Sequence, residues 1–293
     1  MGTDSGMKNK AAAPWLGSKR NLAPVAITLL GLHRVYWELF CGSMAVTFAK
    51  KPCVMETVVD LHADVTNLAK VLQVEELALK LYARTARTLM SDQLHQEARN
   101  RLVEARQVEL DGPDLDRAYD YLLCSWQGRN GAAGTACYNS GFCVRYTSNG
   151  GHAAKRWKGV IESIPWWHQR LLNVTVLRRD VFEVGEKIED KAGTAIYCDP
   201  PYFEKSAKYL HDFTDEDHER LAELLGRFKE TRVVLSYYQH DRLDELYPTW
   251  TKHYKTVAKA MSHQNKRGEN KTKAIEVLLT NHDTSEHRDE LFS

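Results

Sequence analysis

The chain of 293 residues suits one large domain, or one domain that carries a sizeable insertion. Hydrophobic residues make up 43% and charged residues 27%, which is ordinary for a globular protein, and no run approaches the roughly 20 apolar residues of a membrane span. Residues 1–6 lack the apolar core of a secretion signal, and the six scattered cysteines form no C-x-x-C pair, so we expect a cytoplasmic protein without a zinc site or disulfides.

The first recognisable elements alternate between strand and helix. Residues 34–40 predict a strand, the turn at 41–43 follows, and a helix starts at 44–49. Residues 54–60 predict a second strand, and a helix starts near Asp64. This alternation is typical of the opening of a doubly wound α/β sheet.

The middle of the chain, residues 73–172, differs in character from both ends. Charged helical stretches lead into a segment rich in Gly, Asn, Ser and Thr at 128–151, and then into an aromatic and basic segment at 155–167. Beyond it the chain again predicts sheet elements, namely strands at 174–177, 195–198, 233–236 and 275–279 and a helix at 217–229. We therefore predict an α/β sheet domain from 1–72 and 173–293, interrupted by a mainly helical insertion at 73–172.

The net charge of +1 conceals two basic segments. Residues 117–179 hold nine Lys or Arg against two acids, and residues 252–273 hold seven against one. Two such segments on a neutral chain favour a polyanion-binding face, although a basic run can equally be plain surface. The candidate DNA contacts are Arg129, Arg145, Lys155, Arg156, Lys158, Lys266 and Arg267.

The tetrapeptide Asp199-Pro200-Pro201-Tyr202 directly follows the predicted strand at 195–198. Neither proline can extend a sheet, so the strand ends in a stiff turn that presents a carboxylate, carbonyl oxygens and an aromatic ring. The carboxylate and a carbonyl can accept the N–H bonds of an exocyclic amine, and the tyrosine can stack on the ring that carries the amine. The alternative is a proline-rich turn that merely closes a strand.

A second group of candidates lies after the first two strands. Glu38-Leu39-Phe40-Cys41-Gly42 leads from a strand through a glycine turn to a helix start, where free N–H groups favour electron-rich ligands. Asp60 follows Gly42 by eighteen residues, a spacing at which an acid can bind ribose hydroxyls, although a helix cap is the alternative. Asp180 and Val181 could bracket an adenine ring. Without a G-x-G-x-x-G or Walker motif, S-adenosylmethionine is favoured over NAD and ATP.

Together these motifs resemble those of the Dam-type DNA adenine methyltransferases. Glu38 to Gly42 resembles their E-P-F-x-G segment, Asp60 to Asp64 their D-x-N-x-D/E segment, and Asp199 to Tyr202 is their catalytic D-P-P-Y. Residues 14–20 look like their W-x-G-G-K segment, and residues 273–281 look like their closing strand. The order, with the insertion before D-P-P-Y, is that of the α-type arrangement. This chain departs at Ser18, Met44 and His62, which stand where the family has Gly, Gly and Asn.

The resemblance implies a Rossmann-like methyltransferase sheet that transfers methyl from S-adenosylmethionine to N6 of an adenine flipped out of double-stranded DNA, with target recognition in the insertion. The implied catalytic residues are Asp199, Pro200, Pro201 and Tyr202, and the implied cofactor residues are Trp15, Lys19, Glu38, Phe40, Gly42, Asp60, Asp180, Val181 and Asp199. No metal, membrane or obligatory protein partner is expected, and the site of action is the cytoplasm of a bacterial or phage-infected cell.

Several alternatives stay open at this point. The same catalytic loop could act on cytosine N4 or on adenine in RNA, and a catalytically idle DNA-binding homologue could keep the fold. A metal-dependent nuclease is disfavoured because no clustered D/E/K spacing accompanies Asp199. The enzyme could be paired with a separate restriction nuclease or could act alone.

Overall fold

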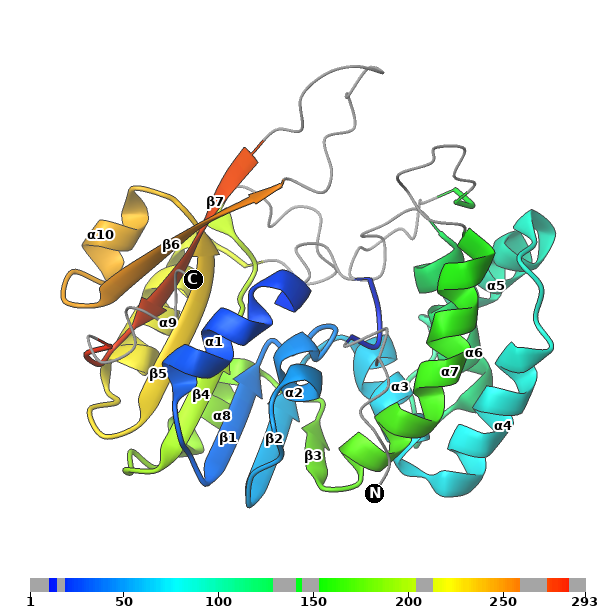
Figure 1. Cartoon of the computed structure of the whole chain (residues 1–293), viewed down its shortest axis with the longest axis horizontal. Coiled ribbons are helices and arrows are strands. Elements are labelled where there is room, and N and C mark those ends of the chain that lie inside the picture. The colour runs from blue at the N-terminus through cyan, green and yellow to red at the C-terminus, as the bar shows by residue number, and fades with distance from the viewer. Residues whose placement is uncertain are drawn as a thin grey trace.

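The computed structural model describes residues 11–14, 19–128, 141–143, 153–203, 213–258 and 273–284. Within them, seven strands form one sheet in the order β3-β2-β1-β4-β5-β7-β6 (Figure 1). The strands are β1 (Val35–Leu39), β2 (Met55–Val59), β3 (Val174–Leu177), β4 (Thr194–Cys198), β5 (Arg232–Tyr238), β6 (Thr251–Ala258) and β7 (Lys273–Thr280). The first five are parallel, and β7 lies antiparallel between β5 and β6. The predicted α/β class is confirmed.

The two faces of the sheet are covered by different helices because neighbouring side chains of a strand point to opposite faces. On one face, Ala195 and Tyr197 of β4 belong to a cluster with α1 (Ala23–Leu30). On the other, Ile196 and Cys198 belong to a cluster with α8 (Val181–Lys187) and α9 (Asp215–Gly226). All five residues of β4 are buried, as expected for a central parallel strand.

The helices of the predicted insertion gather on one side of the molecule (Figure 1). They are α4 (Glu75–Ala86), α5 (Asp92–Ala105), α6 (Leu115–Gln127) and α7 (Ala153–Leu171). Helices α4, α6 and α7 pack against α3 (Ala63–Gln73), and α5 packs against α6. One hydrophobic cluster joins Phe48 of α2 (Ala45–Ala49), Leu68 of α3 and the buried Trp157 and Trp167 of α7. The four helices α4 to α7, called the helical block below, therefore share one hydrophobic core with the helices that cover the sheet. The bounds of the insertion, 73–172, stay a prediction.

A buried ionic junction reinforces this contact. Asp64 of α3 is 1% exposed and lies 2.6 Å from Arg117 Nε and 3.3 Å from Arg106 Nε, both on the helical side. Arg117 also donates to the carbonyl oxygens of Ala105 and Val108, at 2.9 and 3.1 Å, so it caps the end of α5 as well. Burial opposes the charge of Asp64, but His62 and the two arginines outweigh it and lower the pKa of this carboxyl.

Two short elements complete the described fold. The 3₁₀ helix η1 (Lys19–Asn21) precedes α1, and α10 (Arg242–Leu246) lies between β5 and β6. No helix in the described ranges is long and apolar enough to cross a membrane. The described cysteines, 41, 53, 124, 143 and 198, are free thiols.

Candidate active site

The candidate site lies where the direction of the sheet changes. Strand β1 pairs with β2 on one side and with β4 on the other, so the loops that follow β1 and β4 diverge at their carboxyl ends. This is the switch point at which open α/β sheets bind ligands. The backbone N–H of Asp199 donates to the carbonyl oxygen of Leu39 at 3.2 Å, which fastens the end of β4 to the end of β1. The two motifs that are far apart in the sequence thus meet here.

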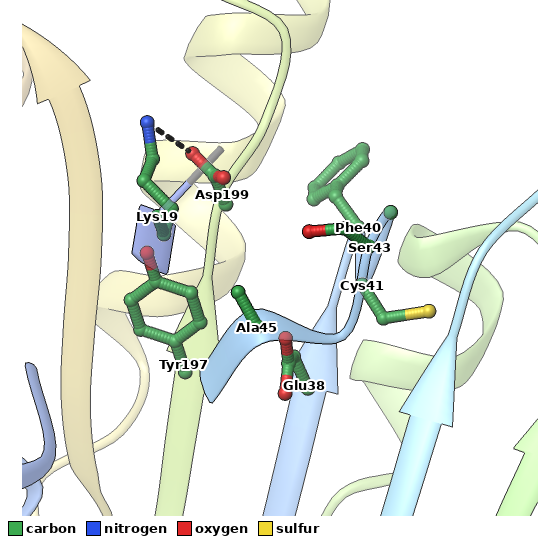
Figure 2. Close-up of a pocket in the computed structure, with 9 residues that line it drawn as sticks. Lys19, Glu38, Phe40, Cys41, Ser43, Ala45, Tyr197 and Asp199 are labelled. Carbon is green, nitrogen blue, oxygen red and sulfur yellow. Dashed lines mark ion pairs between the residues drawn. The ribbon is translucent and has the colours of Figure 1, made fainter. Parts of the chain in front are cut away.

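A pocket opens between these two loops. Figure 2 shows Lys19 and Asp199 on one side of it and Phe40 and Ser43 on the other. The complete lining consists of Lys19, Glu38, Phe40, Cys41, Gly42, Ser43, Ala45, Tyr197 and Asp199. Five of the predicted site residues (Lys19, Glu38, Phe40, Gly42 and Asp199) therefore share one pocket.

The turn after β1 adopts left-handed backbone conformations at three positions. The φ angles are 57° at Phe40, 45° at Gly42 and 55° at Met44. Glycine accepts this conformation readily, whereas a residue with a Cβ is destabilised by about 1–2 kcal/mol. The Met44 side chain is 1% exposed in the hydrophobic cluster under the turn, which holds the residue in this conformation. Met44 thus adopts the left-handed conformation without being a glycine.

Two carboxylates stabilise the turn from inside. Asp60 accepts hydrogen bonds from the backbone N–H groups of Gly42 and His62, both at 2.8 Å. Glu38, which is 2% exposed, accepts from the N–H of Thr47 at 2.8 Å, near the start of α2, and from the hydroxyl of Tyr36 at 2.9 Å. The sequence analysis expected free N–H groups at this helix start, but the N–H groups of Gly42 and Thr47 are bonded to carboxylates of the protein itself.

The acid of the D-P-P-Y motif belongs to a network of buried polar groups. Lys19 Nζ lies 3.3 Å from Asp199 Oδ1 and 3.1 Å from Glu276 Oε2, and its side chain is 4% exposed. The Tyr202 hydroxyl lies 3.2 Å from each of these two carboxylate oxygens and also contacts Lys19 Nζ. The Ser236 hydroxyl, on β5, completes the network at 3.2 Å from the Tyr202 oxygen. One ammonium and one phenol thus link two acids.

Burial alters the ionisation of the acids in the pocket. It raises the pKa of Glu38 to about 7, although bonds from Thr47 and Tyr36 favour the charged form. It also raises the pKa of Asp199 to about 6, a rise that Lys19 limits and Glu276 increases. For Lys19, burial alone would lower the pKa, but the charges of Asp199 and Glu276 outweigh it and hold the pKa above its ordinary value.

The residues expected to bracket an adenine ring lie at the end of β3. The N–H of Asp60 donates to the carbonyl oxygen of Leu177 at 3.1 Å, so this end is next to that of β2. Asp180 is exposed and caps α8 by accepting from the N–H of Phe182 at 2.7 Å. The Val181 side chain is 3% exposed in the core. The neighbouring Phe182 stacks on Phe213 with ring centroids 6.2 Å apart.

The predicted DNA contacts are only partly within the described residues. Four of them lie outside the described residues: Arg129, Arg145, Lys266 and Arg267. The predicted cofactor residue Trp15 also lies outside them. On α7, Lys155 and Lys158 are exposed, and Lys158 Nζ lies 3.7 Å from Glu162. Arg156 donates to the carbonyl oxygen of Trp126 at 2.7 Å near the end of α6, so at least part of its guanidinium has a structural role.

Sequence reasoning missed three residues near Asp199. These are Tyr197 on β4, Ser236 on β5 and Glu276 on β7. Glu276 could have been noticed in the sequence, because it is the one charged residue in the otherwise apolar run at 274–279. Among the described residues, no group of three or more His, Cys, Asp or Glu side chains is arranged to hold a metal ion.

Comparison with known proteins identifies the family of the chain. The profile of the D12 class N6 adenine-specific DNA methyltransferases matches residues 15–267, which is most of the chain. The chain belongs to this family. It is also 26% identical over 286 residues to a protein named DNA adenine methylase from Serratia marcescens, and the alignment covers 92% of this chain and 98% of the relative. The enzyme is thus an adenine-specific DNA methyltransferase, and the predicted family, activity and fold are confirmed.

Proposed function

We propose that this D12-class enzyme transfers the methyl group of S-adenosylmethionine to N6 of an adenine flipped out of double-stranded DNA, with Asp199 as the group that aligns the amine. One observation carries the proposal: a carboxylate with a raised pKa lies in a pocket at the switch point, fixed to Leu39 through its backbone and to Lys19 through its side chain. Proline and backbone restraint hold this carboxylate in one place before a substrate arrives.

The chemistry of the pocket fits a cationic cofactor. S-adenosylmethionine supplies a methyl group activated by a sulfonium, and its methionine part carries an ammonium. Glu38 and Asp199 both line the pocket, and burial raises the pKa of each, so a bound cation would stabilise their charged forms. Phe40 offers an apolar ring on the opposite side from Asp199. In this proposal Asp60 orients the ribose of the cofactor mainly indirectly, because its carboxylate fixes the turn at Gly42.

Asp199 and the Pro200 carbonyl would accept the two N–H bonds of the adenine amine. The nitrogen lone pair of adenine is conjugated with its ring, so the amine is a poor nucleophile. Acceptors on both N–H groups favour the geometry in which that lone pair points at the methyl carbon, and Asp199 stabilises the positive charge that develops on nitrogen. Since the proton can leave after transfer, Asp199 does not need to be a strong base.

Flipping is part of the proposal because N6 is hydrogen-bonded inside a duplex. Tyr202 is assigned to stack on the flipped adenine. Its ring is 6% exposed, with Lys19 Nζ at 4.6 Å from the ring centroid, and the rings of Tyr202 and Tyr238 form a T-shaped pair with centroids 4.7 Å apart. These contacts and the hydroxyl bonds fix the ring beside Asp199, so a base stacked there would have its amine near the carboxylate.

The pH dependence follows from the raised pKa of Asp199. Below about pH 6 its carboxylate takes up a proton and loses an acceptor for the amine, so kcat/KM should fall as the pH drops through that value. We expect about a tenfold loss per pH unit on this acid side. Rates measured from pH 5 to 8 at constant ionic strength check this. A rate that stays flat down to pH 5, as expected for an exposed carboxyl with its ordinary pKa of about 4, would contradict the buried network.

The exposed lysines of α7 should contribute to DNA affinity through phosphates. Replacing Lys155 and Lys158 by Ala should reduce the slope of log affinity against log salt by about 1 for each phosphate that the variant no longer neutralises. Binding to a labelled duplex between low and moderate salt gives the slope. Lys187→Ala, an exposed lysine on α8, is the control that should leave it unchanged. An unaltered slope in the double variant would remove α7 from the DNA face.

The direct test uses isotope-labelled S-adenosylmethionine and unmodified duplex DNA, followed by digestion to nucleosides and identification of the labelled product by mass. Labelled N6-methyladenine supports the whole proposal, and a much weaker label on single-stranded DNA supports the duplex substrate. Label on cytosine would change the substrate, and bound cofactor without label would direct the search to RNA. Absence of cofactor binding would contradict the proposal. We place the reaction in the cytoplasm of a bacterial or phage-infected cell, where the DNA lies.

A further inference from the structure

Glu276 lies in the active-site network but outside the part of the chain that the family profile matches, which ends at residue 267. It belongs to β7, opposite Tyr238 of β5 in the antiparallel register, and its side chain is 5% exposed. A buried carboxylate is strongly destabilised unless it is paired. Its partners in the described structure are the ammonium of Lys19 and the hydroxyl of Tyr202.

We propose that Glu276 is a positioning residue, whose carboxylate holds the Lys19 ammonium and the Tyr202 hydroxyl so that Asp199 keeps an oxygen available for the adenine amine. This inference rests on the proposed function, because it assumes the assigned role of Asp199. It extends that function by adding a residue that never touches the adenine.

The distances support this role. Lys19 Nζ is shared between two acids, at 3.3 Å from Asp199 and 3.1 Å from Glu276. Charge-assisted N–H···O bonds are commonly about 2.7–2.9 Å, so neither acid is in the closest possible contact with the ammonium. Without the charge of Glu276, Lys19 would pair more closely with Asp199 alone. That closer pair would occupy the carboxylate that the amine needs.

The charges around the network determine how the pH profile would respond. Among the described residues, the ionisable groups that interact with it are Glu38 from β1, Lys19 from η1, Tyr197 and Cys198 from β4, Asp199 and Tyr202 from the loop after β4, Tyr237 and Tyr238 from β5 and Glu276 from β7. Glu276 raises the pKa values of both Asp199 and Lys19. Neutralising Glu276 should therefore lower the pKa values of Asp199 and Lys19. The fall of kcat/KM at low pH, and any fall at high pH that Lys19 causes, should then occur at lower pH.

The test compares Glu276→Gln, which keeps the shape and removes the charge, with Glu276→Asp, which keeps the charge on a shorter side chain. We expect Glu276→Gln to lower kcat by about 10- to 100-fold, as for other disturbances of alignment, with little change in cofactor affinity and with the acid side of the profile at lower pH. Glu276→Asp should recover part of kcat and keep the acid side in place. Glu223→Gln, at an exposed position on α9, is the control. A fall in kcat with an unmoved profile would mean a purely structural role and would overturn the proposal.

A double-variant cycle covers the case in which Glu276→Gln folds poorly. If Glu276 acts mainly through Lys19, Glu276→Gln should slow the Lys19→Met variant much less than it slows the wild-type enzyme, with any remaining loss due to the bond to Tyr202. Independent, additive effects would contradict the proposal.

A readout without catalysis separates this inference from the proposed function. The pKa of Lys19, followed by NMR of ¹³C-labelled lysine and assigned with Lys19→Arg, should fall in Glu276→Gln. If the wild-type enzyme labels no adenine but this pKa falls, the electrostatic pairing stands and the proposed function fails. If the pKa is unchanged, the pairing itself is wrong.

Discussion

Asp199→Ala is expected to lower the rate of methyl transfer by about 10³-fold or more, the effect typical of removing a group aimed at developing charge. The substitution removes the acceptor for the amine but leaves the network largely satisfied. Lys19 keeps Glu276 as a partner at 3.1 Å, and the Tyr202 hydroxyl keeps Ser236 and Glu276, each at 3.2 Å. The variant should therefore fold and bind DNA, and Glu38 stays in the pocket to attract the cationic cofactor, so the main defect should appear in the chemical step.

Single-turnover transfer of labelled methyl, with cofactor and duplex affinities measured in parallel, checks this expectation. Asp199→Asn is the matched variant, because it keeps the shape and one acceptor oxygen, and it should retain more activity than Asp199→Ala. Asp241→Ala, at an exposed position before α10, is the control and should behave as wild type. Turnover of Asp199→Ala within tenfold of wild type would remove Asp199 from the reaction.

The central part of the site could be predicted because it depends on local patterns and one topological rule. A strand that ends in two prolines must turn out of the sheet at Asp199, and a strand followed by Gly42 must turn sharply into a helix. In a doubly wound sheet the loops at the carboxyl ends of neighbouring central strands lie together. The pocket between Gly42 and Asp199 follows from these facts, and the structure contains it.

Glu276 could not be predicted in the same way, because its partner is 257 residues away. Its contact with Lys19 depends on β7 lying antiparallel between β5 and β6 and on a register that places Glu276 opposite Tyr238. A shift of one residue would turn Glu276 to the other face of the sheet. Sequence patterns identify the strand but contain little information about this register.

Some elements were missed for other reasons. Helix α1 carries Pro24 in its first turn and ends at Gly31 with φ 61°, and both are recognisable helix-end signals. Strand β6 lies mostly in the second basic segment, which the sequence analysis interpreted by its charge, as a polyanion-binding face or plain surface, and not as a strand. As an edge strand it is exposed at Lys255 and Thr256, so its sequence lacks the continuous apolar run that marks the central strands.

The predicted acid Asp64 illustrates how a motif residue can act in folding. Sequence similarity placed it in the D-x-N-x-D/E segment, whereas the structure pairs it with Arg106 and Arg117 across the contact between α3 and the helical block. Next to this pair, Asn67 exchanges two hydrogen bonds of 2.8 Å with the backbone of Asp114. The contact between α3 and the helical block therefore depends on polar groups of α3 that each pair with a group of the helical block.

Asp64→Ala is accordingly expected to destabilise the protein strongly. The substitution leaves Arg117, 5% exposed, and Arg106, 11% exposed, without the carboxylate that neutralises them. Removing one partner of a buried ion pair costs about 3–5 kcal/mol, which corresponds to a melting temperature lower by about 10 °C in a chain of this size. Thermal unfolding followed by circular dichroism, in the absence of DNA and cofactor, measures the shift.

The matched control for Asp64 lies on the neighbouring helix. Asp116 of α6 pairs with Arg84, but its side chain is 83% exposed, so Asp116→Ala should change stability by less than about 1 kcal/mol. The comparison isolates burial, because both variants remove one aspartate that pairs with arginine. Equal melting temperatures for the two variants would show that the junction at Asp64 is hydrated in solution. A large destabilisation in Asp64→Ala alone would show that this buried carboxylate stabilises the contact between α3 and the helical block. That block includes α7, which carries the exposed Lys155 and Lys158.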